Sequence, residues 1–365
     1  MGIEDEIEAA REKLQETPVN KATETERARL KAKIAQLEEE QEKRQAETGS
    51  STQGYAVEKT GDATVALVGY PSVGKSTLLN QLTNAESEVG EYEFTTLDVV
   101  PGILQHRGAH IQLLDVPGLI GGAADDKGGG QQVLSVIRNA DMVVLMADPD
   151  RLDGFDRMDE ELYDAGIRTN MEPPNIKVTK KDKGGIDVKA PIDLTQIDRD
   201  TLEDVMEQWG YVNATIVIRE DVGIDRVIDA LATNRVYMPA LKVVNKADQI
   251  DKDTKIEIED EYDDPIFISA EHGTNLETLK DAIFEHLGLI RVYLKQKSNT
   301  EADKEEPMIM EEGDSVETLC EQLHDTFLDR FKHARVWGES AKHPGQRVGL
   351  DHTIQDEDTI EITKQ

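Results

Sequence analysis

The octapeptide Gly69–Ser76, which reads GYPSVGKS, constrains the fold of this chain more than any other segment. It follows the apolar run Val65–Val68 directly and precedes a helical pattern over Lys75–Leu82. GxxxxGKS between a strand and a helix is typical of a phosphate-binding loop, in which backbone N–H groups close around phosphates, the lysine neutralises their charge and the hydroxyl binds Mg²⁺. The residues expected to hold a nucleotide here are Gly69, Ser72, Val73, Gly74, Lys75, Ser76 and Thr77.

Short apolar runs alternate with amphipathic stretches after this loop, a pattern typical of α/β folds. Such runs suit buried parallel strands, and the amphipathic stretches suit the crossover helices between them. We therefore predict an α/β P-loop domain with a mainly parallel sheet. The expected strands are Thr64–Val68, His110–Leu114, Met142–Ala147, Leu241–Val244 and Ile266–Ile268. The expected helices are Lys75–Leu82, Gln131–Arg138 and Leu276–Leu287.

The other segments predict additional domains. Residues 1–48 are rich in Glu, Lys and Ala with apolar residues at helical spacing, and Pro18 interrupts the pattern, so we expect a helical hairpin. Residues 49–61 are small, polar and turn-rich, which predicts a linker. The full set of expected domains is then 1–48, linker 49–61, P-loop domain 62–166 and 238–288, inserted α+β subdomain 167–237, and a small separate domain 289–365.

Local patterns predict elements inside the insertion and the final region. For the insertion we expect a hairpin-like turn at Lys183–Gly185, a strand over 215–218, and helices over 202–208 and 224–231. For the final region we expect strands over 292–294, 307–310 and 360–362, and one helix over 316–327.

Two further motifs predict a nucleotide switch. Thr95 and Thr96 lie in a loop downstream of the phosphate-binding loop, where a hydroxyl can reach Mg²⁺ and sense the γ-phosphate. Asp115 and Gly118 form a DxxG pattern at the end of an apolar run. The aspartate of such a pattern holds Mg²⁺ through water, and the glycine N–H meets the γ-phosphate. The glycine-rich stretch 121–130 is permissive enough to reorder as a second switch.

The base-reading residues are expected at the ends of two later apolar runs. Asp248 of the NKAD sequence can accept hydrogen bonds from the ring N–H and amino group of guanine, whereas adenine offers no matching pair of donors. The pattern therefore predicts GTP and GDP as ligands and argues against ATP. The residues expected around the base are Asn245, Lys246, Asp248, Ser269, Ala270 and Glu271.

The charge of the chain is strongly negative. It contains 75 acidic and 41 basic residues, which gives a formal net charge of −34, spread over every segment. At about 1 M salt the Debye length falls to ~3 Å and such self-repulsion is largely screened. The composition therefore resembles that of proteins from salt-loving cells. An acidic protein that binds basic partners is the alternative.

The number of cysteines and the hydropathy of the chain indicate its cellular compartment. Cys320 is the single cysteine, so neither an intrachain disulfide nor a thiolate zinc site can form. No run approaches the ~20 apolar residues of a membrane span, and the first residues are acidic rather than basic. We expect a cytoplasmic chain without a secretion signal and without a membrane partner.

Taken in order, GYPSVGKST, EFTT, DVPGLIGGA, NKAD and SAE resemble the Obg superclass of P-loop GTPases, and more narrowly the developmentally regulated GTP-binding proteins. Longer strings extend the resemblance to nearly the whole chain: NKATE near the start, NRVYMPAL at the end of the insertion, and FKHARVWGES, QRVGLDH and EDTIEI in a region that is similar to a TGS domain. A TGS domain is a ubiquitin-like β-grasp module.

The resemblance implies an enzyme that hydrolyses GTP to GDP and phosphate as a switch associated with translation. Its TGS domain would contact RNA, the ribosome or a regulatory protein partner. The residues implied in catalysis are Lys75, Thr96 and Gly118, and those implied at Mg²⁺ are Ser76, Thr96 and, through water, Asp115. Leu119 stands where Ras-like proteins have a water-positioning glutamine, so hydrolysis is expected to be slow. A nucleotide-gated RNA-binding or assembly module with little turnover is the alternative.

The chain departs from the family pattern at three positions. Gly121 replaces a residue that is usually glutamate, and the stretch near Gly130 lacks the usual arginine. The resemblance leaves K⁺ as a possible activator, but Ser72 departs from it, because potassium-dependent relatives often carry asparagine at this position.

One window of the acidic chain is basic. Between positions 330 and 347 only Glu339 opposes a set of basic residues, and Trp337 is available for stacking. The residues expected to contact RNA or the ribosome are Arg330, Lys332, Arg335, Trp337, Lys342 and Arg347. An ordinary solvated face is the alternative. A second, mixed window extends from Lys177 to Lys189.

Overall fold

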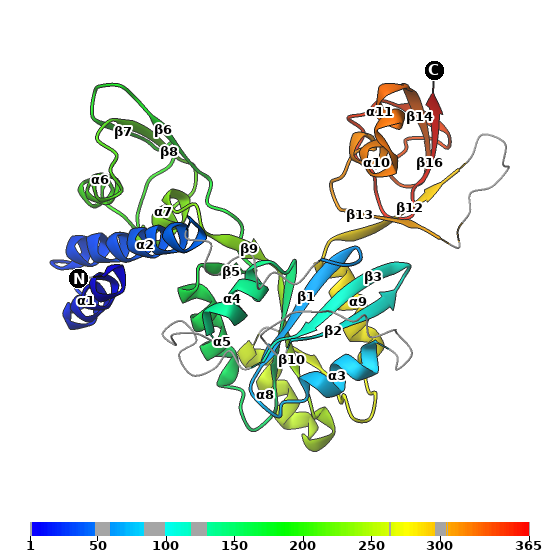
Figure 1. The fold of residues 1–365 in the computed structure, drawn as a ribbon, viewed down its shortest axis with the longest axis horizontal. Coiled ribbons are helices and arrows are strands. Elements are labelled where there is room, and N and C mark those ends of the chain that lie inside the picture. The colour runs from blue at the N-terminus through cyan, green and yellow to red at the C-terminus, as the bar shows by residue number, and fades with distance from the viewer. Residues whose placement is uncertain are drawn as a thin grey trace. The chain divides into compact units, whose positions relative to one another are not determined.

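The computed structural model describes residues 2–47, 59–83, 99–117, 130–262, 264–295, 304 and 306–364. The chain divides into two compact units (Figure 1). One unit combines Met1–Tyr55 with Gly166–Tyr237, and the other combines Ala56–Ala165 with Met238–Gln365. Among the described residues, none of the helices has both the length and the apolar character needed to cross a bilayer.

A six-stranded sheet forms the centre of the second unit. Its strand order is β11-β10-β4-β1-β3-β2, and all neighbours are parallel except the antiparallel pair β2 and β3. The strands are β1 (Ala63–Gly69), β2 (Val100–His106), β3 (Ala109–Asp115), β4 (Met142–Ala147), β10 (Ala240–Val244) and β11 (Ile266–Phe267). The predicted α/β class with a mainly parallel sheet is confirmed.

The helices of this unit cover the sheet because its central strands are apolar on both faces. All seven residues of β1 are buried, for example. Leu78 and Leu79 of α3 and Leu279 of α9 pack against one face, and α4 and α5 lie on the other side (Figure 1). The helices are α3 (Lys75–Leu82), α4 (Gly130–Arg138), α5 (Gly154–Asp164), α8 (Lys252–Tyr262) and α9 (Leu276–His286).

Strand β2 was not among the predicted strands, and its composition explains why. It contains Pro101 and Gly102, two residues that weaken strand patterns, and Leu104 is its one fully buried residue. Proline is tolerated in a sheet at the edge, where its missing N–H costs no ladder bond, and β2 is the edge strand here.

In the first unit, a three-stranded sheet has the order β6-β8-β7. The expected hairpin around Lys183–Gly185 is wrong, because β6 and β7 do not pair with each other. Both pair with β8, β6 antiparallel and β7 parallel, so the later strand inserts between them. The elements of this unit are α1 (Ile3–Glu16), α2 (Glu24–Glu47), β5 (Ile167–Thr169), β6 (Ile176–Lys180), β7 (Ile186–Lys189), α6 (Arg199–Gln208), β8 (Ala214–Ile218), α7 (Ile224–Leu231) and β9 (Val236–Met238).

The N-terminal hairpin shares a core with the inserted segment. Ala28, Ala32 and Ala35 of α2 are buried in one cluster with apolar residues of α6, α7 and β8. Small side chains let α2 approach this core closely. The hairpin turn itself is set by Asn20, whose side-chain oxygen accepts hydrogen bonds from the backbone N–H groups of Ala22 and Thr23.

The last segment forms a five-stranded sheet with the order β13-β12-β16-β14-β15. The single helix expected over 316–327 is wrong, because His324 is extended and its Nδ1 accepts a hydrogen bond from Thr326 N, which starts a second short helix. Strands β14 and β15 were not predicted. The elements are β12 (Leu289–Leu294), β13 (Met308–Glu311), α10 (Val316–Leu323), α11 (Asp325–Asp329), β14 (Phe331–Trp337), β15 (Gln346–Val348) and β16 (Thr359–Lys364).

Candidate nucleotide site

The loop between β1 and α3 has the local geometry of a phosphate cradle. Ser72 and Gly74 adopt positive φ angles of 66° and 103°, which turns the chain sharply before α3 begins at Lys75. The Lys75 ammonium donates to the carbonyl oxygens of Gly69 (2.9 Å) and Tyr70 (3.3 Å). Burial lowers the pKa of Lys75, and the nearby Asp115 carboxylate partly opposes this shift. A buried cation therefore stands at the N-terminus of a helix, where an anion is stabilised.

Two glycines of the loop are required by close contacts, and Gly74 is required by its positive φ as well. A Cβ atom on Gly69 would lie 2.5 Å from the Met146 carbonyl oxygen. A Cβ atom on Gly74 would lie 2.3 Å from Asn245 Nδ2. Larger residues at either position would push the loop away from β4 and from the loop after β10.

Ser76 and Asp115 form the second part of the site. Asp115 ends β3 and is paired in register with Leu67 of β1, which brings it beside the first turn of α3. The Ser76 hydroxyl donates to Asp115 Oδ2 at 2.5 Å. Ser76 is exposed while Asp115 is buried, so the pair lies at the boundary between solvent and the core.

Asn245 connects the base-reading loop to the phosphate-binding loop. Its Nδ2 donates to Val73 O at 2.8 Å, and its Oδ1 accepts from Ala270 N at 2.9 Å. Asn245 is buried, so both bonds are shielded from water. One side chain therefore joins three loops that lie far apart in the sequence, as expected for residues meeting at the carboxyl edge of a parallel sheet.

Asp148 is a residue of this region that the sequence analysis missed. It follows β4 directly and is 8% exposed, and its Oδ2 accepts from Lys246 Nζ at 2.9 Å. Its other oxygen, Oδ1, is buried and has no partner among the described residues. Lys246 itself has a positive φ of 61°. An acidic residue directly after an apolar run was the signal available in the sequence.

The remaining base-reading residues lie beside this loop. Asp248 is exposed, and a hydrogen bond from the Ser269 side chain lowers the pKa of its carboxyl, which favours the ionised acceptor. Ser269 and Ala270 are buried and Glu271 is exposed. Thr77 is exposed on the first turn of α3. Thr96 and Gly118, the expected switch residues, lie outside the described residues, as do Leu119 and Gly121.

The RNA candidates are distributed over the five-stranded sheet and its loops. Arg335 of β14 pairs in register with Arg347 of β15 and with Glu361 of β16, so these side chains share one face. His333 and Trp337 of β14 lie on the same face, because they alternate with the buried Ala334 and Val336. Outside this face, three exposed candidates lie before β14, at its start and in the loop after it: Arg330, Lys332 and Lys342.

Local contacts differ among these candidates. Lys295 Nζ lies 4.7 Å from the Trp337 ring centroid, and a Cβ atom on Gly345 would lie 3.3 Å from the ring, so Trp337 already contacts its own chain. Burial and the neighbouring cations Arg347 and Arg335 lower the pKa of His333. The basic character of the face is therefore carried by Arg335 and Arg347.

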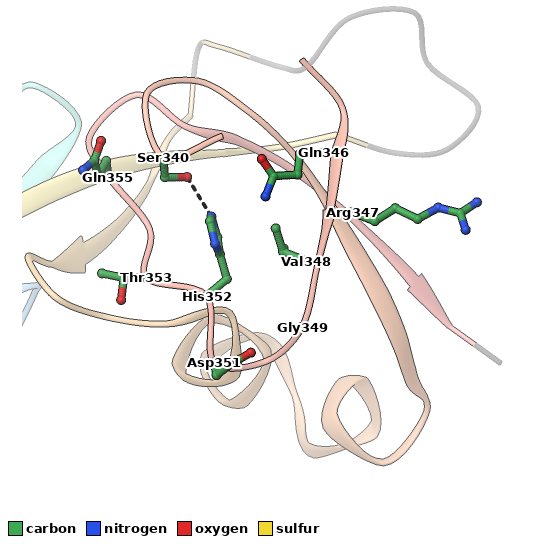
Figure 2. A pocket seen from close by; sticks show the side chains of 9 residues that line it. All are labelled: Ser340, Gln346, Arg347, Val348, Gly349, Asp351, His352, Thr353 and Gln355. Atoms are coloured by element: carbon green, nitrogen blue, oxygen red, sulfur yellow. Dashed lines mark hydrogen bonds between the residues drawn. The ribbon is translucent and has the colours of Figure 1, made fainter. Parts of the chain in front are cut away.

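An open cavity of about 480 Å³ lies beside this sheet (Figure 2). Its lining is polar, and the Ser340 hydroxyl and His352 Nε2 are hydrogen-bonded at 2.9 Å. Arg347 is one of the lining residues, and its side chain points away from the other labelled residues (Figure 2). The arginine is thus available to the sheet face rather than to the cavity.

Comparison with known proteins decides the family. Three family models match the chain in succession: a 50S ribosome-binding GTPase over residues 64–181, a C-terminal region of that GTPase domain over 183–289, and a TGS domain over 290–364. Developmentally regulated GTP-binding protein 2 of Homo sapiens is 40% identical over 365 residues, covering 100% of both chains. The chain belongs to the family of developmentally regulated GTP-binding proteins.

Archaeal relatives are more similar still. A GTP-binding protein of Methanocaldococcus jannaschii is 50% identical over 366 residues, covering 99% of this chain and 93% of the relative. A GTP-binding protein of Halobacterium salinarum is 47% identical over 369 residues, covering 99% of both. The chain is therefore a GTP-binding member of the GTPase family with a C-terminal TGS domain.

Proposed function

We propose that this chain hydrolyses GTP to GDP and phosphate as a slow switch that engages the ribosome or RNA. The observation that carries the proposal is the meeting of three loops through Asn245, which ties the NKAD loop to Val73 and to Ala270. Lys75, Ser76 and Asp115 lie on the adjoining turn. One nucleotide can then contact phosphate-binding and base-reading residues at the same time.

Each residue has a role that follows from its chemistry. Backbone N–H groups of the loop 72–77 hold the phosphates, and Lys75 neutralises the charge that develops on them. Asp248 accepts from the guanine edge, beside Lys246, Ser269, Ala270 and Glu271. Thr96 and Gly118 take the switch roles that the family resemblance implies.

The Ser76 and Asp115 pair fits Mg²⁺. Both present oxygen ligands, and among the described residues no cluster of three or more His, Cys, Asp or Glu forms a closed metal cage. Mg²⁺ prefers such an incomplete set, completed by water and by phosphate oxygens. When bound, the ion neutralises charge on the β- and γ-phosphates. Slow turnover with K⁺ as a possible activator is expected, because Leu119 stands at the position of the water-positioning glutamine in Ras-like proteins.

We infer that the TGS domain supplies the contact with RNA, through Arg335, Arg347 and His333 on one sheet face. Two arginines on adjacent strands suit phosphate oxygens, since the guanidinium binds them with two parallel hydrogen bonds. Arg330, Lys332 and Lys342 extend the positive charge, and Trp337 holds Lys295 beside it.

Turnover tests the enzymatic part of the proposal. Lys75→Ala should abolish phosphate release from GTP in the presence of Mg²⁺ and K⁺, because the buried ammonium is lost from the cradle. Lys252→Ala, at an exposed position on α8, is the matched control and should retain wild-type turnover. Wild-type hydrolysis by Lys75→Ala would refute the assignment of Lys75.

Co-sedimentation with ribosomes tests the switch. Binding should differ between a non-hydrolysable GTP analogue and GDP, measured across a range of KCl concentrations. Equal binding in the two states would sink the switch. If the wild-type protein also released no phosphate with ribosomes and K⁺ present, the GTPase switch would be replaced by the alternative function, an RNA-binding or assembly module with little turnover.

A further inference from the structure

The described helices of the first unit pack on one face of the three-stranded sheet β6-β8-β7, and none of them covers its other face. Its inner face carries Ile216 and Ile218 into the core shared with α2, α6 and α7. The alternate residues point to the other side. We define the outer face by its six residues, Lys177, Thr179, Asp187, Lys189, Thr215 and Val217. Figure 1 shows the helices of this unit gathered on the opposite side of these strands.

Strand register arranges the outer face in two rows. Lys177 and Lys189 flank Val217 in one row, since both pair with it. Thr179 and Asp187 flank Thr215 in the other. The two lysines are therefore two strand spacings apart, about 10 Å. This register depends on the insertion of β8 between β6 and β7, because a direct hairpin would have placed the lysines on adjacent strands.

The six residues of the outer face include two lysines and one aspartate, a formal net charge of +1 in a chain whose net charge is −34. Residues 175–189 and 213–219 contain two acidic residues, Asp182 and Asp187. The basic residues of the same two segments are Lys177, Lys180, Lys181, Lys183, Lys189 and Arg219. In the part of the chain that the structure describes, the side chains of Lys177, Lys181 and Lys183 make no ion pair or hydrogen bond, whereas Lys189 Nζ lies 3.7 Å from Asp187 Oδ2. The ammonium groups of Lys177 and Lys183 are therefore exposed and are not neutralised by any described residue.

The composition of the face selects the class of partner. Protein interfaces are enriched in aromatic residues, Met and Arg at their centre and depleted in Lys. The outer face has no aromatic residue, and Val217 is its one apolar side chain. Lysine ammonium and threonine hydroxyl groups are instead the donors that position phosphates without reading bases. We propose that the outer face binds the phosphate backbone of RNA, as a contact separate from the TGS domain.

This inference rests on the proposed engagement of RNA and adds a second site to it. The probe is fluorescently labelled polyuridine RNA, and binding by the full chain with GDP is measured by anisotropy at several KCl concentrations. For single strands the logarithm of affinity falls with the logarithm of salt by ~0.7 per phosphate neutralised. Lys177→Gln combined with Lys189→Gln should therefore weaken binding and reduce the magnitude of this slope by ~1.4.

Matched variants separate the local contact from net charge. Lys21→Gln combined with Lys252→Gln removes two exposed lysines elsewhere and should leave the slope unchanged. Lys177→Arg combined with Lys189→Arg keeps the charge and should retain the wild-type slope. GDP affinity, measured separately, reports the integrity of the fold and should be the same in all variants.

Three results would overturn the proposal. An unchanged slope in Lys177→Gln with Lys189→Gln would show that these lysines do not contact phosphates. A change equal to that in Lys21→Gln with Lys252→Gln would show that only the net charge of the chain matters. Loss of polyglutamate binding in the Gln pair, with RNA binding retained, would assign the face to an acidic polypeptide. Failure of the wild-type protein to bind RNA in any nucleotide state would instead refute the proposed RNA binding itself. The variant Arg335→Gln with Arg347→Gln measures the contribution of the TGS domain in parallel.

Discussion

Lys246 of the NKAD loop is held by Asp148, whose Oδ2 lies 2.9 Å from the lysine Nζ. Asp148 follows β4, so the contact joins the carboxyl ends of two neighbouring strands of the sheet. Its Oδ1 is buried without a partner among the described residues, so the ammonium is the main compensation for a buried carboxylate. The pair therefore orients a lysine two residues from Asp248, the aspartate that we propose reads the base.

Asp148→Asn should weaken GDP binding about tenfold, because Lys246 loses the negative charge that orients it. The loss of affinity is no larger because Lys246 is partly exposed to solvent. Asp150→Asn changes an exposed aspartate two residues away and should leave affinity unchanged. In a Lys246→Met background the Asp148 substitution should have little further effect. Additive losses in the double variant, measured by titration with a fluorescent GDP analogue, would contradict this coupling.

Asp248→Asn should shift base preference from guanine towards xanthine. The ionised carboxylate accepts two hydrogen bonds from guanine, whereas an amide presents N–H donors that match the additional oxygen of xanthine. We expect GDP affinity to fall by one to two orders of magnitude, roughly the effect of leaving a buried polar edge unpaired, and affinity for xanthosine diphosphate to rise. Asp253→Asn on α8 is the control. An unaltered preference would refute the base-reading role of Asp248.

RNA affinity should rise as the pH falls below about 6.5, the ordinary pKa of histidine. Burial and the neighbouring arginines hold the pKa of His333 below that value, so the free face carries a neutral imidazole near pH 6.5. A bound phosphate favours the cation and raises this pKa, so binding takes up a proton and strengthens on acidification. The same group should lower fold stability as the pH drops through 6.5, because the unfolded chain then binds the proton first.

His333→Gln tests this assignment. The variant should bind RNA with a flatter pH profile below pH 6.5 and with unchanged affinity above it. Retention of the full wild-type pH dependence would mean that another group titrates.

The excess of acidic over basic residues predicts stabilisation by salt. Raising KCl from about 0.1 M to about 1 M shortens the Debye length from ~10 Å to ~3 Å and screens repulsion among the 75 acidic residues. The midpoint of thermal unfolding should rise over this range and rise less in an osmotically matched sucrose solution. A midpoint that stays flat or falls with KCl would favour the other explanation of the composition, a basic partner.

Much of the geometry of the candidate nucleotide site could be predicted, because each part of it is local. GxxxxGKS determines a turn whose glycines avoid clashes and whose lysine returns to Gly69 within six residues. DxxG and NKAD each follow a buried strand, and parallel strands end at one edge of a sheet. The motif residues thus converge wherever the strands are placed in the expected order.

The same local patterns could not predict contacts between strands. Asp148 carries no motif, and its role depends on β4 lying next to β10. Pro101 and Gly102 hid an edge strand, and His324 ended a helix that its apolar spacing would have continued. In each case a packing or capping contact overrode the local preference.

By itself, the sequence of this protein determined the phosphate-binding turn, the helices and strands beside it and the chemistry of each motif, because these depend on neighbouring residues. The tertiary structure alone decided that β8 lies between β6 and β7, that Lys177 and Lys189 flank Val217, and that Arg335 meets Arg347. Strand order and register follow from burial of whole faces against distant helices, and a shift of one residue would reverse every side chain of a strand.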